Sequence, residues 1–158
     1  MSAANLQRLE NLAATQALAQ RMALSVRAGD TLLLMGDLGA GKTTFTQSLV
    51  AALSPTPVEV TSPTFTLVQH YPITTADGAH TDLFHYDLYR IEDPSALIEL
   101  GLDDAASGLR VIEWPERLGA TFAPSSWLAI TLRIGEDGAR NATWRAGGAL
   151  AQRLAPIA

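Results

Sequence analysis

One short motif constrains this chain more than any other feature of its sequence. Residues 36–43, Gly-Asp-Leu-Gly-Ala-Gly-Lys-Thr, match the phosphate-binding pattern G-x-x-x-x-G-K-[ST] at every fixed position. Glycine lets the backbone turn so that several N–H groups face one anion, and a following helix adds the positive end of its dipole. Because an apolar run precedes the motif and a helix-forming segment follows it, the motif predicts a nucleotide-phosphate loop.

The residues of this loop have separate expected roles. The loop backbone and its helix start are expected to bind the phosphates through Gly36, Gly39, Ala40, Gly41, Lys42, Thr43 and Thr44. Lys42 is expected to reach the β- and γ-phosphates, and the Thr43 hydroxyl to bind Mg²⁺. Lys42 is the only lysine among eleven basic residues, so no Asn-Lys-x-Asp motif, a common guanine reader, exists here. ATP with Mg²⁺ is therefore the expected ligand pair.

The rest of the chain predicts an α/β domain. Helices are expected over 5–24, 42–53 and 93–101 and from 147 onward, and strands over 31–35, 58–60, 64–71, 83–89, 109–114, 126–134 and 139–145. Residues 72–81 are expected to form a long, mobile connection between two paired strands. Strands and helices alternate early and hairpins follow, which predicts a P-loop NTPase fold: a central mixed sheet flanked by helices, with antiparallel hairpin additions. The length of 158 residues suits one domain over 1–158.

Composition excludes several classes of function. The net charge is −5 and basic residues are scattered singly, so tRNA is expected to be bound only indirectly or weakly. The chain contains no cysteine, which excludes disulfides, thiolate catalysis and zinc–cysteine sites. No apolar run approaches the ~18 residues of a membrane helix, and the N-terminus does not resemble an export signal. We therefore expect a cytoplasmic protein without a membrane partner.

Two acidic residues are candidates for the metal and the attacking water. Glu113 ends a buried apolar strand, and Asp87 lies in an alternating segment with His85. Each also has a plainer interpretation, Glu113 as a solvated strand end paired with Arg117 and Asp87 as a surface acid paired with Arg90. Spacing alone does not separate these alternatives. His85 is expected to be a structural hydrogen-bonding residue rather than a base.

A Ser-Pro segment follows the predicted phosphate-loop helix. Its Thr64 hydroxyl lies where many P-loop proteins carry a nucleotide-sensing switch, so it could bind the γ-phosphate or Mg²⁺. By position alone, an ordinary Ser-Pro turn is the simpler interpretation.

Four motifs together resemble the bacterial TsaE (YjeE) family, the ATPases of tRNA threonylcarbamoyladenosine synthesis. They are GDLGAGKTTF at 36–45, SPTFTLV at 62–68, HYDLYR at 85–90 and IEWPE at 112–116, and the resemblance runs from Thr15 to Trp127. It implies ATP and Mg²⁺, with Thr43 and Glu113 as metal ligands and functional roles for Asp87 and Trp114. It also implies two partner proteins that carry out the transfer chemistry next to the anticodon.

The resemblance leads to an expected activity with one alternative. We expect an ATPase that is slow alone, is stimulated by its partner proteins and is a monomer in isolation. The alternative is a small-molecule or nucleotide kinase, for which Arg133, Arg140 and Arg145 are candidate lid residues. A nucleotide-binding adaptor without turnover is a third interpretation.

Overall fold

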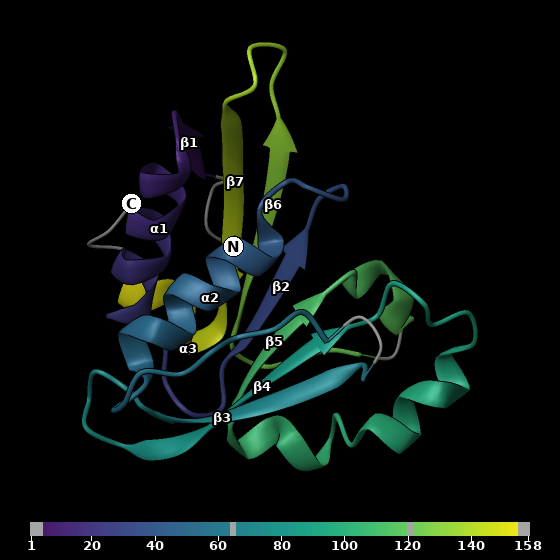
Figure 1. The fold of residues 1–158 in the computed structure, drawn as a ribbon. Helices are drawn as coiled ribbons and strands as arrows, with labels where there is room; N and C mark the ends of the chain where they lie inside the picture. The colour runs from purple at the N-terminus through teal and green to yellow at the C-terminus, as the bar shows by residue number, and fades with distance from the viewer. Residues whose placement is uncertain (1–4, 64–65, 120–121, 155–158) are drawn as a thin grey trace.

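A computed structural model describes residues 5–63, 66–119 and 122–154 (Figure 1). Its strands are β1 (Asn5–Leu9), β2 (Thr31–Met35), β3 (Val68–Thr74), β4 (His80–Asp87), β5 (Leu109–Glu113), β6 (Trp127–Ile134) and β7 (Arg140–Gly147). The helices are α1 (Leu12–Ala23), α2 (Lys42–Leu53) and α3 (Gly148–Leu154), with three 3₁₀ helices, η1 (Pro94–Leu100), η2 (Asp104–Ser107) and η3 (Pro115–Leu118).

The strands form one mixed sheet in the order β1-β7-β6-β2-β5-β4-β3. The central strand β2 is parallel to β5 and β6, and β4 is parallel to β5. The antiparallel partners lie at the two edges, β3 beside β4 on one side and the β6–β7 hairpin with β1 on the other. The predicted mixed sheet with antiparallel hairpin additions is therefore confirmed. Ligands of such sheets bind outside the carboxyl ends of the parallel strands, which is where the loop after β2 begins.

Two apolar cores cover the two faces of the sheet. Helices α1, α2 and α3 share the larger core with alternate strand residues such as Leu32 and Val111 (Figure 1). The smaller core lies under the 3₁₀ helices and takes the intervening residues, among them Tyr86 and Ile112. Because β4 and β5 are covered on both faces, the polar groups at their ends are held on a rigid support.

The predicted helix over 5–24 is wrong in its first part. Residues Asn5–Leu9 form β1, which pairs with β7, and α1 begins only at Leu12. Asn11 marks the change because its side-chain oxygen accepts a hydrogen bond from the Ala14 N–H and caps the helix. The open edge of β7 provides the hydrogen-bond partners that make the strand more favourable than another turn of helix.

The predicted connection between the first pair of strands is also wrong. The β3–β4 ladder continues through Pro72, which lies opposite Asp82, and only a short turn closed by the Thr75 N–H and the Ala79 carbonyl remains. Proline is tolerated here because β3 is an edge strand.

Smaller differences concern two other segments. Residues 58–60 form no strand, and the helix expected over 93–101 is the 3₁₀ helix η1, capped by Asp93 and ended by left-handed Gly101. The predictions of β2, α2, β5, the β6–β7 hairpin and α3 are confirmed. No helix in the described ranges is both long and apolar enough to span a bilayer.

Candidate nucleotide-binding site

The loop between β2 and α2 has the backbone of an anion cradle. Gly36 has a φ of +146°, and a Cβ placed there would lie 2.5 Å from the Leu132 carbonyl oxygen on β6. Gly41 is left-handed at φ +110° and is the N-cap of α2, without a side chain that could block the helix end. Glycine is thus required at Gly36 by close packing and at Gly41 by conformation. The N-terminus of α2 points its N–H groups at the space where a phosphate would bind.

Lys42 is almost fully buried at the start of α2, with 5% of its surface exposed. Its Nζ donates to the Gly36 carbonyl at 2.6 Å and lies 3.7 Å from the centre of the Trp114 ring. Burial lowers the pKa of the ammonium from its usual value, while the charges of Glu113 and Asp87 oppose that shift. The side chain is a cation held in a poorly solvated site that faces two carboxylates.

The two candidate carboxylates meet at the ends of neighbouring parallel strands. Asp87 ends β4 and Glu113 ends β5, and they lie opposite each other in the register. Asp87 is 6% exposed and Glu113 is 2% exposed. The alternative of Glu113 as a solvated strand end paired with Arg117 is therefore wrong, and so is that of Asp87 as a surface acid. Asp87 also accepts a hydrogen bond from the Tyr89 N–H at 3.0 Å, which orients its carboxylate.

A buried histidine orients Glu113. His85 Nε2 lies 2.5 Å from Glu113 Oε2, and the imidazole is fully buried. Within the described part of the chain its Nδ1 has no hydrogen-bond partner. The neutral tautomer with hydrogen on Nε2 satisfies this geometry, because it donates to Glu113 and leaves no unpaired N–H in the core. The expectation that His85 makes a structural hydrogen bond is confirmed.

Trp114 combines an unusual backbone with two ring contacts. Its φ of 59° and ψ of 50° are left-handed, which is uncommon for a non-glycine residue and costs about 1–2 kcal/mol. The indole packs on Tyr89 with ring centroids 4.9 Å apart and faces the Lys42 ammonium. The strained residue sits directly after Glu113 and turns its ring towards the phosphate loop. Backbone strain of this kind clusters at functional sites.

These groups line one cleft of about 220 Å³. The cleft is lined by Leu38, Gly39, Gly41, Lys42, Thr43, Thr44, Ser62, Asp87, Glu113 and Trp114. It thus brings together most of the residues singled out in the sequence. Gly36 and Ala40 lie just outside it, in the supporting part of the loop. Thr64 lies outside the described residues. Ser62, two residues earlier in the same segment, lines the cleft.

The donors of the cleft fit a magnesium ion. Thr43 supplies a hydroxyl oxygen, and Asp87 and Glu113 supply carboxylate oxygens, the ligand type that Mg²⁺ prefers. No group of three or more potential metal-ligating His, Cys, Asp or Glu side chains occurs among residues 5–63, 66–119 and 122–154. Proteins usually hold Mg²⁺ through one or two carboxylates together with substrate phosphates.

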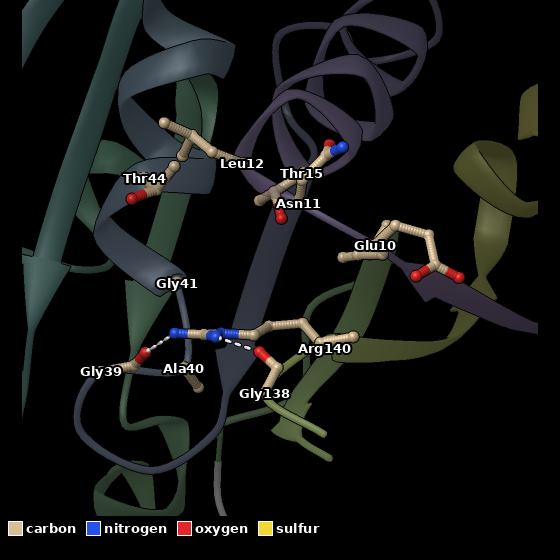
Figure 2. Close-up of a pocket in the computed structure, with 12 residues that line it drawn as sticks. Glu10, Asn11, Leu12, Thr15, Gly39, Ala40, Gly41, Thr44, Gly138 and Arg140 are labelled. Atoms are coloured by element: carbon tan, nitrogen blue, oxygen red, sulfur yellow. Dashed lines mark hydrogen bonds between the residues drawn. The ribbon is translucent and has the colours of Figure 1, made fainter. Parts of the chain in front are cut away.

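A second pocket lies on the other side of the same loop (Figure 2). This outer pocket is lined by Leu9, Glu10, Asn11, Leu12, Thr15, Gly39, Ala40, Gly41, Thr44, Gly138, Ala139 and Arg140. Arg140 donates to the Gly39 carbonyl at 2.9 Å and to the Gly138 carbonyl at 2.7 Å, so it ties the loop to the β6–β7 hairpin. Sequence reasoning missed this site, since Arg140 is 101 residues from Gly39 and carries no motif.

Comparisons with known proteins agree with these observations. The sequence profile described as "Threonylcarbamoyl adenosine biosynthesis protein TsaE" matches residues 9–142. The tRNA threonylcarbamoyladenosine biosynthesis protein TsaE of Bacillus subtilis is 39% identical over 136 residues, which cover 85% of this chain and 80% of that protein. The protein of the same name from Rickettsia felis is 38% identical over 117 residues, 73% of this chain and 66% of the relative's length.

The match to a solved structure covers nearly the whole chain. The crystal structure of YdiB from Bacillus subtilis superposes with a TM-score of 0.76 at 31% identity, over 99% of this chain and 95% of that one. This similarity, together with the loop between β2 and α2, confirms the predicted P-loop NTPase fold.

Proposed function

Because the chain belongs to the TsaE family, we propose that it is a Mg²⁺-dependent ATPase that serves tRNA threonylcarbamoyladenosine synthesis. The relatives' names supply the pathway, and the cleft supports the activity. The observation that carries the proposal is the position of the only lysine, held by the phosphate loop opposite two buried carboxylates. This arrangement suits a nucleotide triphosphate with a divalent cation.

Each group in the cleft has a proposed role. The loop backbone from Gly39 to Thr44 binds the phosphates, and Lys42 neutralises charge on the β- and γ-phosphates. Thr43 and Glu113 hold Mg²⁺, which when bound withdraws charge from the phosphate oxygens and favours departure of the diphosphate. Asp87 orients the attacking water.

His85 and Trp114 act on these groups rather than on the substrate. His85 fixes one oxygen of Glu113 through the 2.5 Å hydrogen bond and so orients the carboxylate at the wall of the cleft. Trp114 covers the Lys42 ammonium, at 3.7 Å, and limits its access to water. The site therefore keeps its cation and its anions in fixed positions before any ligand enters.

Hydrolysis by the isolated chain is proposed to be slow. Lys42 is the only cation among the described residues that line the cleft. Arg140, one of the three lid candidates of a kinase, is bound to the loop's outer turn. A missing positive charge at the γ-phosphate is worth about 10³-fold or more in rate when a partner supplies it. We propose that the proteins of the threonylcarbamoyl-transfer complex supply it, and that the chain alone is a monomeric single domain.

Following a radiolabelled γ-phosphate tests the proposal. The chain is incubated with labelled ATP, Mg²⁺ and cell-derived small molecules, with and without the transfer proteins and tRNA. Free phosphate that increases with the transfer proteins is expected. A labelled small acceptor would establish the kinase alternative instead, and unchanged ATP in every mixture would leave only a nucleotide-binding adaptor.

Two variants assign the activity to the loop. Lys42→Ala and Thr43→Ala are expected to abolish ATP-dependent phosphate release while circular dichroism shows a folded protein. Arg27→Ala is a suitable control because that exposed side chain lies outside the cleft. Normal ATP affinity and turnover in Lys42→Ala would overturn the assignment.

A further inference from the structure

We propose that a groove among the 3₁₀ helices docks a basic, amphipathic segment of a partner protein. This acidic groove is lined by, among others, Leu97, Ile98, Asp103, Asp104, Leu118 and Phe122. The inference rests on the proposed function, which calls for partner proteins, and adds the surface that recognises them. The segment from η1 to η2, green in Figure 1, lies on the side of the sheet away from α1 and α2 and has no part in the cleft.

The acidic groove combines an apolar cavity with an exposed apolar side chain. Its volume is about 540 Å³, more than twice that of the cleft. Leu97 and Leu118 line it and are almost buried, whereas Ile98 exposes 83% of its surface. Single exposed apolar residues are common, but one that lines an open cavity adds to a continuous surface that a partner can cover. Grooves of this kind receive the apolar face of an amphipathic segment.

The charges around the groove select the partner. Five exposed carboxylates lie on the segment that forms it: Glu92, Asp93, Glu99, Asp103 and Asp104. No lysine or arginine occurs over residues 91–109, and on η3 the charges of Glu116 and Arg117 cancel. A surface of one sign attracts a partner of the opposite sign and repels polyanions such as RNA. The groove is therefore complementary to a protein segment whose apolar side chains are flanked by lysine or arginine.

Arg110 holds the wall of the groove against the sheet. This buried side chain of β5 donates to the Leu102 carbonyl at 3.0 Å through Nη1. Its Nε and Nη2 donate to the Thr31 hydroxyl on β2 at 3.1 and 2.9 Å. The guanidinium also lies 5.0 Å from the centre of the Phe122 ring, in another part of the lining. The groove is thus formed before a partner arrives, which reduces the ordering cost of binding.

The helix η3 connects the acidic groove with the nucleotide cleft. Leu118, its last residue, lines the groove, and Trp114, its N-cap, lines the cleft beside Lys42. Trp114 and Leu118 also pack on the same smaller core. A segment docked in the groove therefore contacts the element that positions Trp114. This continuity explains how a protein bound here acts on ATP hydrolysis without entering the cleft.

Calorimetric titration with the purified transfer proteins tests the apolar part of the proposal. Ile98→Gln removes the exposed apolar surface, and Leu24→Gln is the matched control, because Leu24 is 71% exposed at the end of α1 and outside the groove. Binding should weaken about tenfold in Ile98→Gln and change by less than about twofold in Leu24→Gln. Both side chains lie outside the cleft, so hydrolysis by the isolated variants should equal that of the wild type.

Charge reversal tests the electrostatic part. Asp103→Lys changes an exposed residue of the groove, and Glu136→Lys makes the same change in the exposed β6–β7 turn. Asp103→Lys should weaken binding about tenfold at ~50 mM salt, and the difference from wild type should shrink severalfold at ~500 mM because salt screens exposed charges. Equal losses in the two variants would mean that only net charge matters, which would overturn the assignment to this groove.

Other occupants of the groove give different results. Concentration-dependent dimers of the wild type that Ile98→Gln abolishes in sedimentation would assign the groove to a second copy of the chain. Binding of tRNA by the chain alone that Ile98→Gln abolishes would assign it to RNA. Either result, or unchanged binding of the transfer proteins by Ile98→Gln, would overturn the proposal.

Failure of this inference is distinguishable from failure of the proposed function. If the transfer proteins stimulate ATP hydrolysis equally in wild type, Ile98→Gln and Asp103→Lys, the proposed function stands and the groove is not the docking surface. If the chain binds these proteins through the groove but hydrolyses no ATP, the inference stands and the ATPase proposal fails. If the wild-type chain does not bind the transfer proteins, the partner dependence and this inference fail together.

Discussion

The hydrogen bond between His85 and Glu113 leads to a measurable prediction about the cleft. Replacing His85 with leucine fills the same place in the core with an apolar side chain of similar size. The change removes the Nε2–H group that donates to Glu113. The carboxylate of Glu113, a residue that is only 2% exposed, would then have an unpaired oxygen inside the protein. We expect a less stable protein whose affinity for Mg²⁺ with ATP is also lower, because the carboxylate is no longer fixed.

The size of the effect follows from the burial of the pair. A hydrogen bond to a charged group contributes about 1.5–3 kcal/mol, and an unpaired buried charge costs about 3–5 kcal/mol. The ammonium of Lys42 interacts with Glu113 and offsets part of that cost. We therefore expect a loss of about 2–3 kcal/mol in the free energy of unfolding. For a chain of this length the melting temperature should fall by about 5–10 °C.

Urea denaturation of four proteins tests the reasoning: wild type, His85→Leu, Glu113→Gln and the double variant. If the buried charge is the cause, the penalty of His85→Leu should shrink to about 1 kcal/mol or less in the Glu113→Gln background. His85→Gln, whose amide nitrogen can donate from a similar position, should recover about half of the loss. An equal penalty in both backgrounds would mean that His85 acts only through packing, and the reasoning would be refuted.

Three further predictions concern the loop and the metal. Gly36→Ala should destabilise the fold by about 2 kcal/mol or more in a denaturation experiment, because its Cβ would lie 2.5 Å from the Leu132 carbonyl at a φ of +146°. Glu113→Gln should weaken Mg²⁺-dependent turnover more than metal-free nucleotide binding, and equal losses would contradict a metal role. Burial lowers the pKa of Lys42 in the folded chain. At pH values between that lowered pKa and the usual pKa, the unfolded chain therefore binds more protons at this side chain than the folded chain does. Wild-type stability relative to Lys42→Met should therefore rise with pH across this window, and a flat difference would contradict the burial argument.

The parts of the site that could be predicted are those set by contiguous residues. The phosphate loop is one uninterrupted segment, and its neighbours β2 and α2 have clear apolar patterns. From the sequence, Glu113 is a candidate because it ends a strand-like run, and Asp87 is a candidate because it lies in an alternating segment with His85. The sequence does not show whether Glu113 and Asp87 are buried, and their burial is what excludes the interpretation as surface residues. The register that places them side by side comes from the β4–β5 pairing.

The parts that could not be predicted depend on distant partners. Leu6, Leu9 and Leu12 fit a helical spacing, yet Asn5–Leu9 form a strand because the edge of β7, far along the chain, is open for pairing. The hydrogen bond between Arg140 and the Gly39 carbonyl likewise joins residues that are 101 positions apart in the sequence. Local propensity carries no information on such pairings, because the deciding hydrogen bonds belong to another part of the sequence.

The order of the strands explains why the two sides of the loop carry different side chains. Parallel strands β4 and β5 end beside the loop, so the side chains that follow them converge there, and this half carries both carboxylates. On the other side β6 runs on into a hairpin, and β7 and β1 return antiparallel. That half therefore presents the β1–α1 junction and the start of β7 to the loop, with Glu10, Leu12 and Arg140 among its side chains. The cleft half thus places two carboxylates beside Lys42, whereas the outer half combines apolar groups with Arg140 and Glu10. A single glycine-rich loop after the central strand β2 separates these two halves.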